Sequence, residues 1–175
     1  MLKYKLIEEL KNHFGTDKLN LEQNLKVTEC AAELIKLFKT KYPNENLSEQ
    51  VIIYSAVLHD LGLKQDKTNS ENNSIILKKL KSSASAKDLI SSLNIESLNI
   101  DFQTMEEIAQ IVIHHHKAGK VSSNNFKILY DAEWIIKLED NYQLNKLSEK
   151  EKDTLIEEKL ISDLAKNLAR KRFLK

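Results

Sequence analysis

The sequence has few of the residues that form tight turns, with only three glycines and one proline among 175 residues. Two-residue β-hairpin turns need residues that tolerate positive φ, so this scarcity argues against hairpins and favours helices joined by polar loops. The single cysteine, Cys30, excludes an intrachain disulfide and is compatible with a reducing compartment. It lies within a helical apolar pattern, so we expect it to pack in the core.

Long apolar stretches and an excess of one charge are also missing. No segment approaches the ~20 apolar residues that span a bilayer, and charges interrupt the first 15 residues too often for a signal peptide. The 27 basic and 26 acidic residues leave a net charge of +1, which attracts neither nucleic acid nor an anionic membrane. The basic end at 169–175 is interpreted as a solvated helix terminus. We therefore expect a cytoplasmic protein that binds neither membranes nor nucleic acid.

Apolar residues recur at helical spacing along most of the chain. The length fits one domain, and no internal repeat or long linker divides it. We therefore expect an all-α, single-domain helical bundle over 1–175. The expected helices are 2–15, 21–38, 48–62, 75–80, 86–93, 104–116, 126–138 and 148–173, with a polar loop at 64–74. Capping boxes are predicted at Thr104 and at Ser148 with Glu151.

The run VIIYSAVLHDLGL at 51–63 is apolar except for its centre, where His59 precedes Asp60. A buried, ionised carboxylate costs several kcal/mol unless a positive group or a metal ion compensates it. Asp60 therefore needs such a partner if the run is buried. Taken alone, the segment is equally compatible with Asp60 capping a helix end and His59 packing in the core.

A run of three histidines ends the helix expected from Thr104. Residues 108, 111, 112 and 115 share one face, so His115 continues the apolar stripe and His114 is its neighbour. His116 is expected to point elsewhere, into solvent. A chance cluster of surface histidines is the alternative interpretation.

The helix expected from Phe126 carries a second acid on an apolar face, because Asp131 aligns with Trp134, Ile135 and Leu138. Two aromatic residues of this helix, Phe126 and Trp134, are assigned to the core rather than to a binding platform. Glu133 and Lys137 form an i, i+4 pair. We expect that pair on the solvated side.

Two carboxylates and several imidazoles on apolar faces form a ligand set for a divalent ion such as Mn, Fe, Co, Ni, Zn or Mg. The segment 58–63, LHDLGL, resembles the "LHDIG" signature of the HD superfamily of metal-dependent phosphohydrolases. The segment 126–134, FKILYDAEW, resembles the family's last motif, an aspartate followed by alanine and an acid. The stretch IVIHHH at 111–116 precedes it, as in a group of small bacterial HD-domain proteins. The resemblance covers about 1–140, with its motifs in 20–140, and implies an HD-type helical bundle.

The resemblance implies that His59, Asp60 and Asp131 are metal ligands. The family's first ligand is a histidine four residues before a valine, and that position here is Gln23, aligned on Val27. A glutamine oxygen can ligate a hard cation, but it is a weaker ligand than imidazole for transition metals. Gln23 is therefore a candidate ligand and also the main departure from the family pattern.

The resemblance also assigns His114 and His115, with Asp60, to catalysis at the phosphate pocket or a second metal. The metal ion would polarise a phosphoryl oxygen and lower the pKa of bound water, and a histidine would protonate the leaving group. Lys117 and Lys120 follow the histidines and are candidates for steering a phosphate towards the ion.

Two hypotheses follow. The first is a metal-dependent phosphohydrolase that acts on a small phosphorylated compound, with nucleotides among the candidates. The alternative is a degenerate HD domain, with no or weak catalysis because of Gln23, that serves as a ligand-binding or protein-interaction module. A purely structural bundle leaves Asp60 and Asp131 on apolar faces unexplained. A homodimer remains open.

Overall fold

The computed structural model describes residues 18–59 and 100–174, which form six α-helices, one short 3-10 helix and no strand. The prediction of an all-α protein is confirmed for this part of the chain. None of the helices described there is long and apolar enough to cross a membrane. The predicted helices at 2–15, 75–80 and 86–93 lie outside the described residues. The helices are α2 (Lys18–Lys41), α3 (Glu49–Leu58), α6 (Phe102–His114), α7 (Asn124–Glu139), η2 (Tyr142–Lys146), α8 (Glu149–Lys159) and α9 (Asp163–Phe173).

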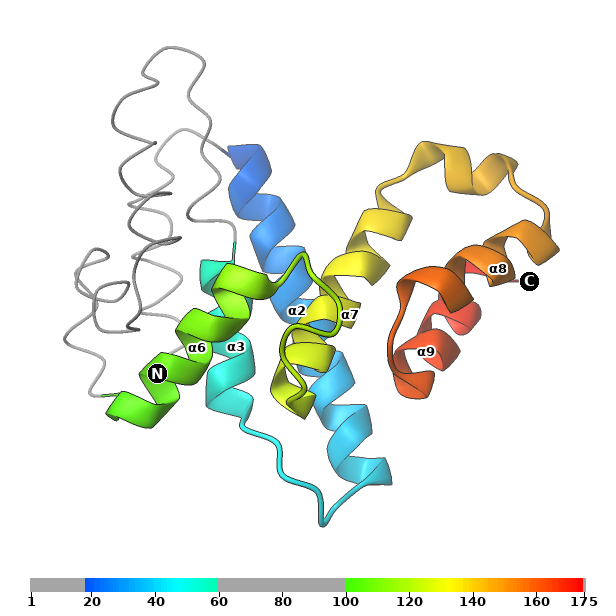
Figure 1. Ribbon diagram of the computed structural model, residues 1–175. Helices are drawn as coiled ribbons and strands as arrows, with labels where there is room; N and C mark the ends of the chain where they lie inside the picture. The colour runs from blue at the N-terminus through cyan, green and yellow to red at the C-terminus, as the bar shows by residue number, and fades with distance from the viewer. Residues whose placement is uncertain (1–17, 60–99, 175) are drawn as a thin grey trace.

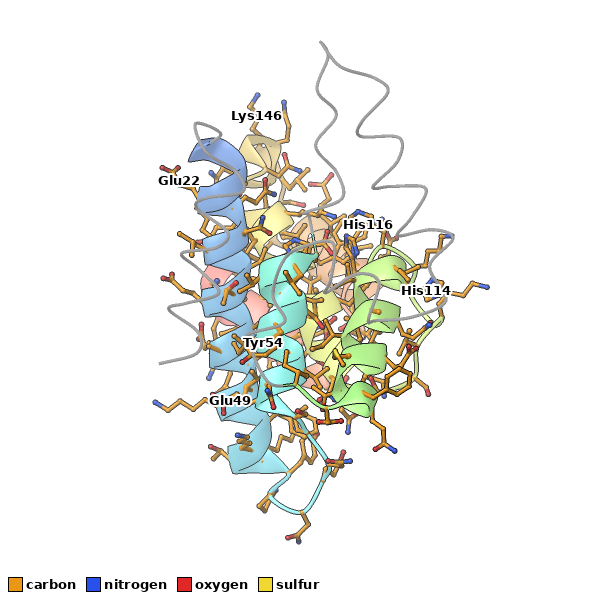
Figure 2. All side chains as sticks on the ribbon, turned by 90° about the vertical axis from the view of Figure 1, so that its left-hand side faces the viewer. Glu22, Glu49, Tyr54, His114, His116 and Lys146 are labelled. Carbon is orange, nitrogen blue, oxygen red and sulfur yellow. The ribbon has the colours of Figure 1, made fainter. Side chains whose placement is uncertain are left out.

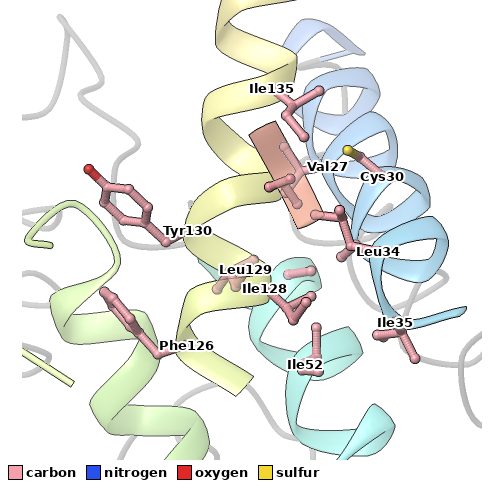
Figure 3. Packing of buried hydrophobic residues seen from close by; sticks show 14 of the residues in the cluster. Val27, Cys30, Leu34, Ile35, Ile52, Phe126, Ile128, Leu129, Tyr130 and Ile135 are labelled. Carbon is pink, nitrogen blue, oxygen red and sulfur yellow. The ribbon is translucent and has the colours of Figure 1, made fainter. Parts of the chain in front are cut away.

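Helix α7 lies at the centre of these helices, with α2, α3 and α6 on one side and α8 and α9 on the other (Figure 1). It contacts α2, α3 and α9 directly, and α3 also packs on α6. Figure 3 shows the core between these helices, where Leu34, Ile52 and Leu129 meet with almost no exposure. Cys30 is also buried there, as predicted. Because α7 has neighbours on most sides, most of its side chains are buried, including the polar residues Asn125, Asp131 and Glu133.

Side-chain caps explain where several helices begin. Ser48 caps α3, and Ser148 with Glu151 forms the predicted capping box of α8. The prediction of a capping box at Thr104 is wrong. Asp101 is the N-cap of α6, and its carboxylate accepts hydrogen bonds from the Thr104 amide at 2.9 Å and from the Thr104 hydroxyl at 2.7 Å. Helix α6 therefore begins at Phe102.

The predicted continuous helix at 148–173 is wrong, because the chain breaks between Lys159 and Asp163 without a glycine or proline. The cause is a contact with α7. Asp131 accepts hydrogen bonds from the Ile161 amide at 2.7 Å, the Ser162 amide at 3.0 Å and the Ser162 hydroxyl at 2.6 Å. A buried carboxylate thus holds an extended junction between α8 and α9 against the central helix. We call this contact the Asp131 anchor.

Asn125, at the start of α7, joins three helices. Its side-chain oxygen accepts a hydrogen bond from the Ser48 amide at the start of α3, at 2.8 Å. Its side-chain nitrogen donates to the Glu107 carboxylate of α6, also at 2.8 Å. Asn125 is 8% exposed, so water cannot easily replace either partner.

We expect Asn125→Ala to lower the free energy of unfolding by about 2 kcal/mol, because it leaves a backbone donor and a carboxylate without their buried partner. Urea denaturation measures the change. Asn124→Ala is the matched control, since Asn124 makes an exposed hydrogen bond to Glu45 and should cost less than about 0.5 kcal/mol. Equal losses in the two variants would contradict this role for Asn125.

Candidate metal centre

Three potential metal ligands meet where α6 ends beside the middle of α7. His115, His116 and Glu133 each offer one ligand atom, and these atoms lie within 4.8 Å of one another. We call this group the histidine–glutamate cluster. Nδ1 of His116 is 3.2 Å from Oε1 of Glu133. Figure 2 shows His114 and His116 at the C-terminal end of α6. The group can therefore hold a metal ion.

The buried histidines of this region have their tautomers fixed by backbone carbonyls. Nδ1 of His115 donates to the Val112 carbonyl at 2.5 Å, and Nδ1 of His59 donates to the Ala56 carbonyl at 2.7 Å. A carbonyl can only accept, so Nδ1 carries a proton in both rings, and Nε2 of the neutral His115 ring presents a lone pair. Metal-binding histidines in proteins are oriented by this kind of hydrogen bond. The two rings meet edge to face, with centroids 5.4 Å apart.

Two buried atoms of the cluster have no hydrogen-bond partner among the described residues, namely Nε2 of His115 and Oε2 of Glu133. An unsatisfied buried polar atom is costly, and most such atoms in folded proteins do find a partner. Both atoms carry lone pairs and act as hydrogen-bond acceptors, so neither can serve as the partner of the other. A cation can bind both atoms at once, and this fit is the strongest structural indication of a metal site.

The prediction that Glu133 lies on the solvated side of its helix is wrong, because Glu133 is only 3% exposed. The predicted pair with Lys137 does form, with Nζ 2.5 Å from Oε1 of Glu133. Lys137 reaches the buried carboxylate from the surface along its flexible stem. The Glu133 charge is thus balanced by an ammonium group that a metal ion could displace.

His115 is electrically neutral at physiological pH. Burial lowers the pKa of its imidazole to about 4, and the neighbouring His59 and His116 act in the same direction, while Glu133 opposes them. A neutral imidazole is the form that coordinates a metal ion. The cluster is therefore ready to bind a cation without first losing a proton from His115.

Chelator-treated protein should lose up to about 3 kcal/mol of stability as the pH falls from 6.5 to about 4. Within this window the unfolded chain binds a proton at His115 and the folded chain does not. The free energy of unfolding therefore decreases as the pH decreases. Urea denaturation across the window measures the slope. His115→Gln cannot titrate at this position and should show a shallower slope. The same slope in both proteins would exclude His115 as the responsible group.

The structure brings some of the predicted site residues together and separates others. His59 is 2% exposed and packs against His115, in agreement with the expected burial of both. Asp131 is also fully buried, but its two oxygens face the α8–α9 junction and it does not belong to the cluster. Burial raises the pKa of its carboxyl, and the donors from Ser162 and Ile161 partly offset that rise.

The remaining predicted residues lie around the cluster or beyond the described chain. Lys117 and Lys120 are exposed in the turn after α6. His114 is half-buried, and its Nδ1 has no partner among the described residues. Gln23 is half-buried near the start of α2. The prediction for Asp60 lies outside the described residues.

Comparisons of the chain with protein-family models, curated proteins and solved structures found no match. The chemical interpretation therefore depends on the residues themselves and on the geometry of the cluster.

Sequence reasoning missed Glu133 as a candidate ligand, although a signal for it was present. The run ILYDAEWII at 128–136 contains two acids in an otherwise apolar segment. A helix that is apolar on all sides is buried on all sides, so both acids had to be buried. The prediction placed Asp131 on a buried face and Glu133 on a solvated face, as in an amphipathic helix. Helix α7 is instead buried on most sides.

Proposed function

We propose that this chain is a metal-dependent phosphohydrolase whose divalent ion is held by His115, His116 and Glu133. The observation that carries the proposal is the pair of unpartnered buried atoms, Nε2 of His115 and Oε2 of Glu133, within one group of ligands. His59 packs against this group and supplies a further imidazole at its edge. The resemblance of the LHDLGL and FKILYDAEW segments to HD-superfamily motifs supports the hydrolase reaction class.

The ligand chemistry favours a particular set of ions. Two imidazoles and a carboxylate suit Mn, Fe, Co, Ni or Zn better than Mg, which prefers an all-oxygen shell. When bound, such an ion would polarise a phosphoryl oxygen as a Lewis acid and lower the pKa of a bound water. The side chain of His116 is 46% exposed, so it would meet a substrate that arrives from solution. Lys137 pairs with Glu133 in the structure, and its ammonium group could bind the phosphate once a metal ion takes its place.

Phosphate release by chelator-treated protein tests the proposal, with Mn, Co, Ni or Zn added back separately. An aryl phosphate and a panel of nucleoside monophosphates serve as substrates, and elemental analysis of the purified protein runs in parallel. We expect bound metal and metal-dependent release. A protein that binds metal but releases no phosphate from any substrate would support the binding-module alternative, for which Gln23 remains the sequence argument. The absence of metal binding by the protein would contradict the proposal.

A further inference from the structure

The two carboxylate oxygens of Glu133 have different surroundings. Oε1 lies 2.5 Å from Nζ of Lys137 and 3.2 Å from Nδ1 of His116. Oε2 is buried and has no hydrogen-bond partner among the described residues. Lys137 therefore already places a positive charge on the carboxylate that is proposed to hold the metal ion.

The contact between His116 and Oε1 of Glu133 has the spacing of two ligands on one ion. Nitrogen and oxygen atoms bound to a tetrahedral zinc ion at about 2.1 Å lie roughly 3.4 Å apart. The separation of Nδ1 and Oε1 in this protein is 3.2 Å. An ion shared by these two atoms binds Oε1, which is also the oxygen that Lys137 contacts. The ammonium group and the ion therefore compete for the same atom.

Electrostatic repulsion also opposes the presence of both cations at Glu133. The carboxylate is buried, so the charges around it are less screened than they would be in water. His115 is neutral, and an ion bound beside the ammonium group of Lys137 would thus share a single carboxylate with it. Movement of the ammonium group away from Oε1 removes this repulsion.

Lys137 has a second favourable contact, with the ring of Trp134. Its Nζ lies 5.2 Å from the centroid of the indole ring, within the range of cation–π attraction. The lysine side chain is 35% exposed and has a flexible stem, so it can leave Oε1 while α7 stays intact. The ring itself packs against Tyr130, with centroids 6.4 Å apart. A released ammonium group therefore keeps an attachment beside the histidine–glutamate cluster.

We propose that Lys137 is a built-in competitor of the metal ion, whose ammonium group neutralises Glu133 in the ion-free protein and moves onto the Trp134 ring when an ion binds. The inference rests on the metal site of the proposed function and adds a control of its occupancy. The ion-free cluster is stabilised because Glu133 keeps a counter-ion. A metal ion occupies the cluster only if it binds Glu133 and the histidines more favourably than Lys137 binds Glu133.

Calorimetry with zinc measures this competition in chelator-treated protein. Lys137→Met keeps most of the stem and removes the charge, so it should bind zinc about tenfold more tightly than the parent protein. Lys137→Arg keeps a cation that pairs well with a carboxylate and should bind zinc no more tightly than the parent protein. The tenfold difference should persist at about 1 M salt, which suppresses long-range repulsion but not competition for one atom.

The matched control is Lys159→Met. Nζ of Lys159 lies 5.3 Å from the centroid of the same Trp134 ring, and Lys159 forms no ion pair with Glu133 in the described part of the chain. The variant removes an equal charge from the same ring and leaves the contact with Oε1 in place. Its zinc affinity should therefore stay within about twofold of the parent value.

Fluorescence follows the movement of Lys137 directly. Trp134 is the only tryptophan of the chain, and zinc has a filled d shell, so it does not quench the emission as an open-shell ion does. We expect saturating zinc to change the emission of the parent protein and of Lys159→Met. The change should be much smaller in Lys137→Met, which has no ammonium group to move.

Equal zinc affinity of Lys137→Met and the parent protein would overturn the inference. Weaker binding by Lys137→Met would also overturn it, because Lys137 would then support Glu133 as a ligand. The absence of a fluorescence response in zinc-saturated parent protein would do the same without any variant. Metal-dependent phosphate release with equal zinc affinities would reject the inference and keep the proposed function. Tighter zinc binding by Lys137→Met without phosphate release from any substrate would do the reverse, and no zinc binding by either protein would reject both.

Discussion

Glu133→Gln should reduce metal-dependent phosphate release by about a hundredfold or more, with a parallel loss of metal affinity. The substitution keeps the size of the side chain and removes the only negative charge of the histidine–glutamate cluster. It also frees Lys137 from its ion pair, so the ammonium group competes with an incoming cation. Phosphate release with added Mn or Co and metal titration by calorimetry measure the two effects.

The control for this variant is Glu158→Gln, which removes an exposed glutamate of α8 and should leave both quantities unchanged. Urea denaturation of chelator-treated Glu133→Gln checks that the variant still folds, because the amide also loses the ion pair with Lys137. Full activity of Glu133→Gln would place the metal elsewhere, and Asp60 with His59 would then be the next candidates.

Asp131→Ala should have the largest effect on stability, lowering the free energy of unfolding by about 3 kcal/mol. Three donors at the start of α9, the amides of Ile161 and Ser162 and the Ser162 hydroxyl, lose their shared acceptor inside the protein. Helix α9 then loses its hydrogen-bonded attachment to α7, whereas the ion pair between Arg172 and Glu139 stays. Urea denaturation in the presence of chelator measures this loss.

Metal binding separates the two interpretations of Asp131. If Asp131 acts only as an anchor, the folded Asp131→Ala variant still binds metal, whereas Glu133→Gln does not. If Asp131 is a ligand, as the HD resemblance implies, metal affinity falls while stability in chelator changes little. Asp153→Ala is the stability control, because it removes only a partly exposed ion pair with Arg170 and should cost less than about 1 kcal/mol.

Helix positions were predictable where the apolar periodicity was strong and a cap was local. Ser48, Ser148 and Glu151 form caps with residues three positions away, so the sequence contains all that is needed. The break at Leu160–Ser162 was not predictable in this way, because its cause, Asp131, lies 30 residues earlier in the chain. Local pattern cannot reveal a helix end that a distant side chain imposes.

The candidate site was predictable in part for a related reason. The burial of His59 and His115 followed from the apolar stripes that they continue. The contacts of Asp131 and Glu133 could not be predicted from such stripes, because α7 is surrounded by other helices and the two acids point to different neighbours. The predictions for Asp60 and for Gln23 as ligands stay predictions.

The reactivity of Cys30 can be used to measure how often helix α9 opens. The only thiol of the chain is buried, and burial raises its pKa to about 12, so its reactive thiolate is scarce at neutral pH. Cys30 lines a cavity of about 380 Å³ together with Arg172 of α9. Arg172 pairs there with Glu33 of α2 and Glu139 of α7. Detachment of α9 would uncover the sulfur. The rate at which a thiol reagent labels the native protein therefore reports how often this helix opens.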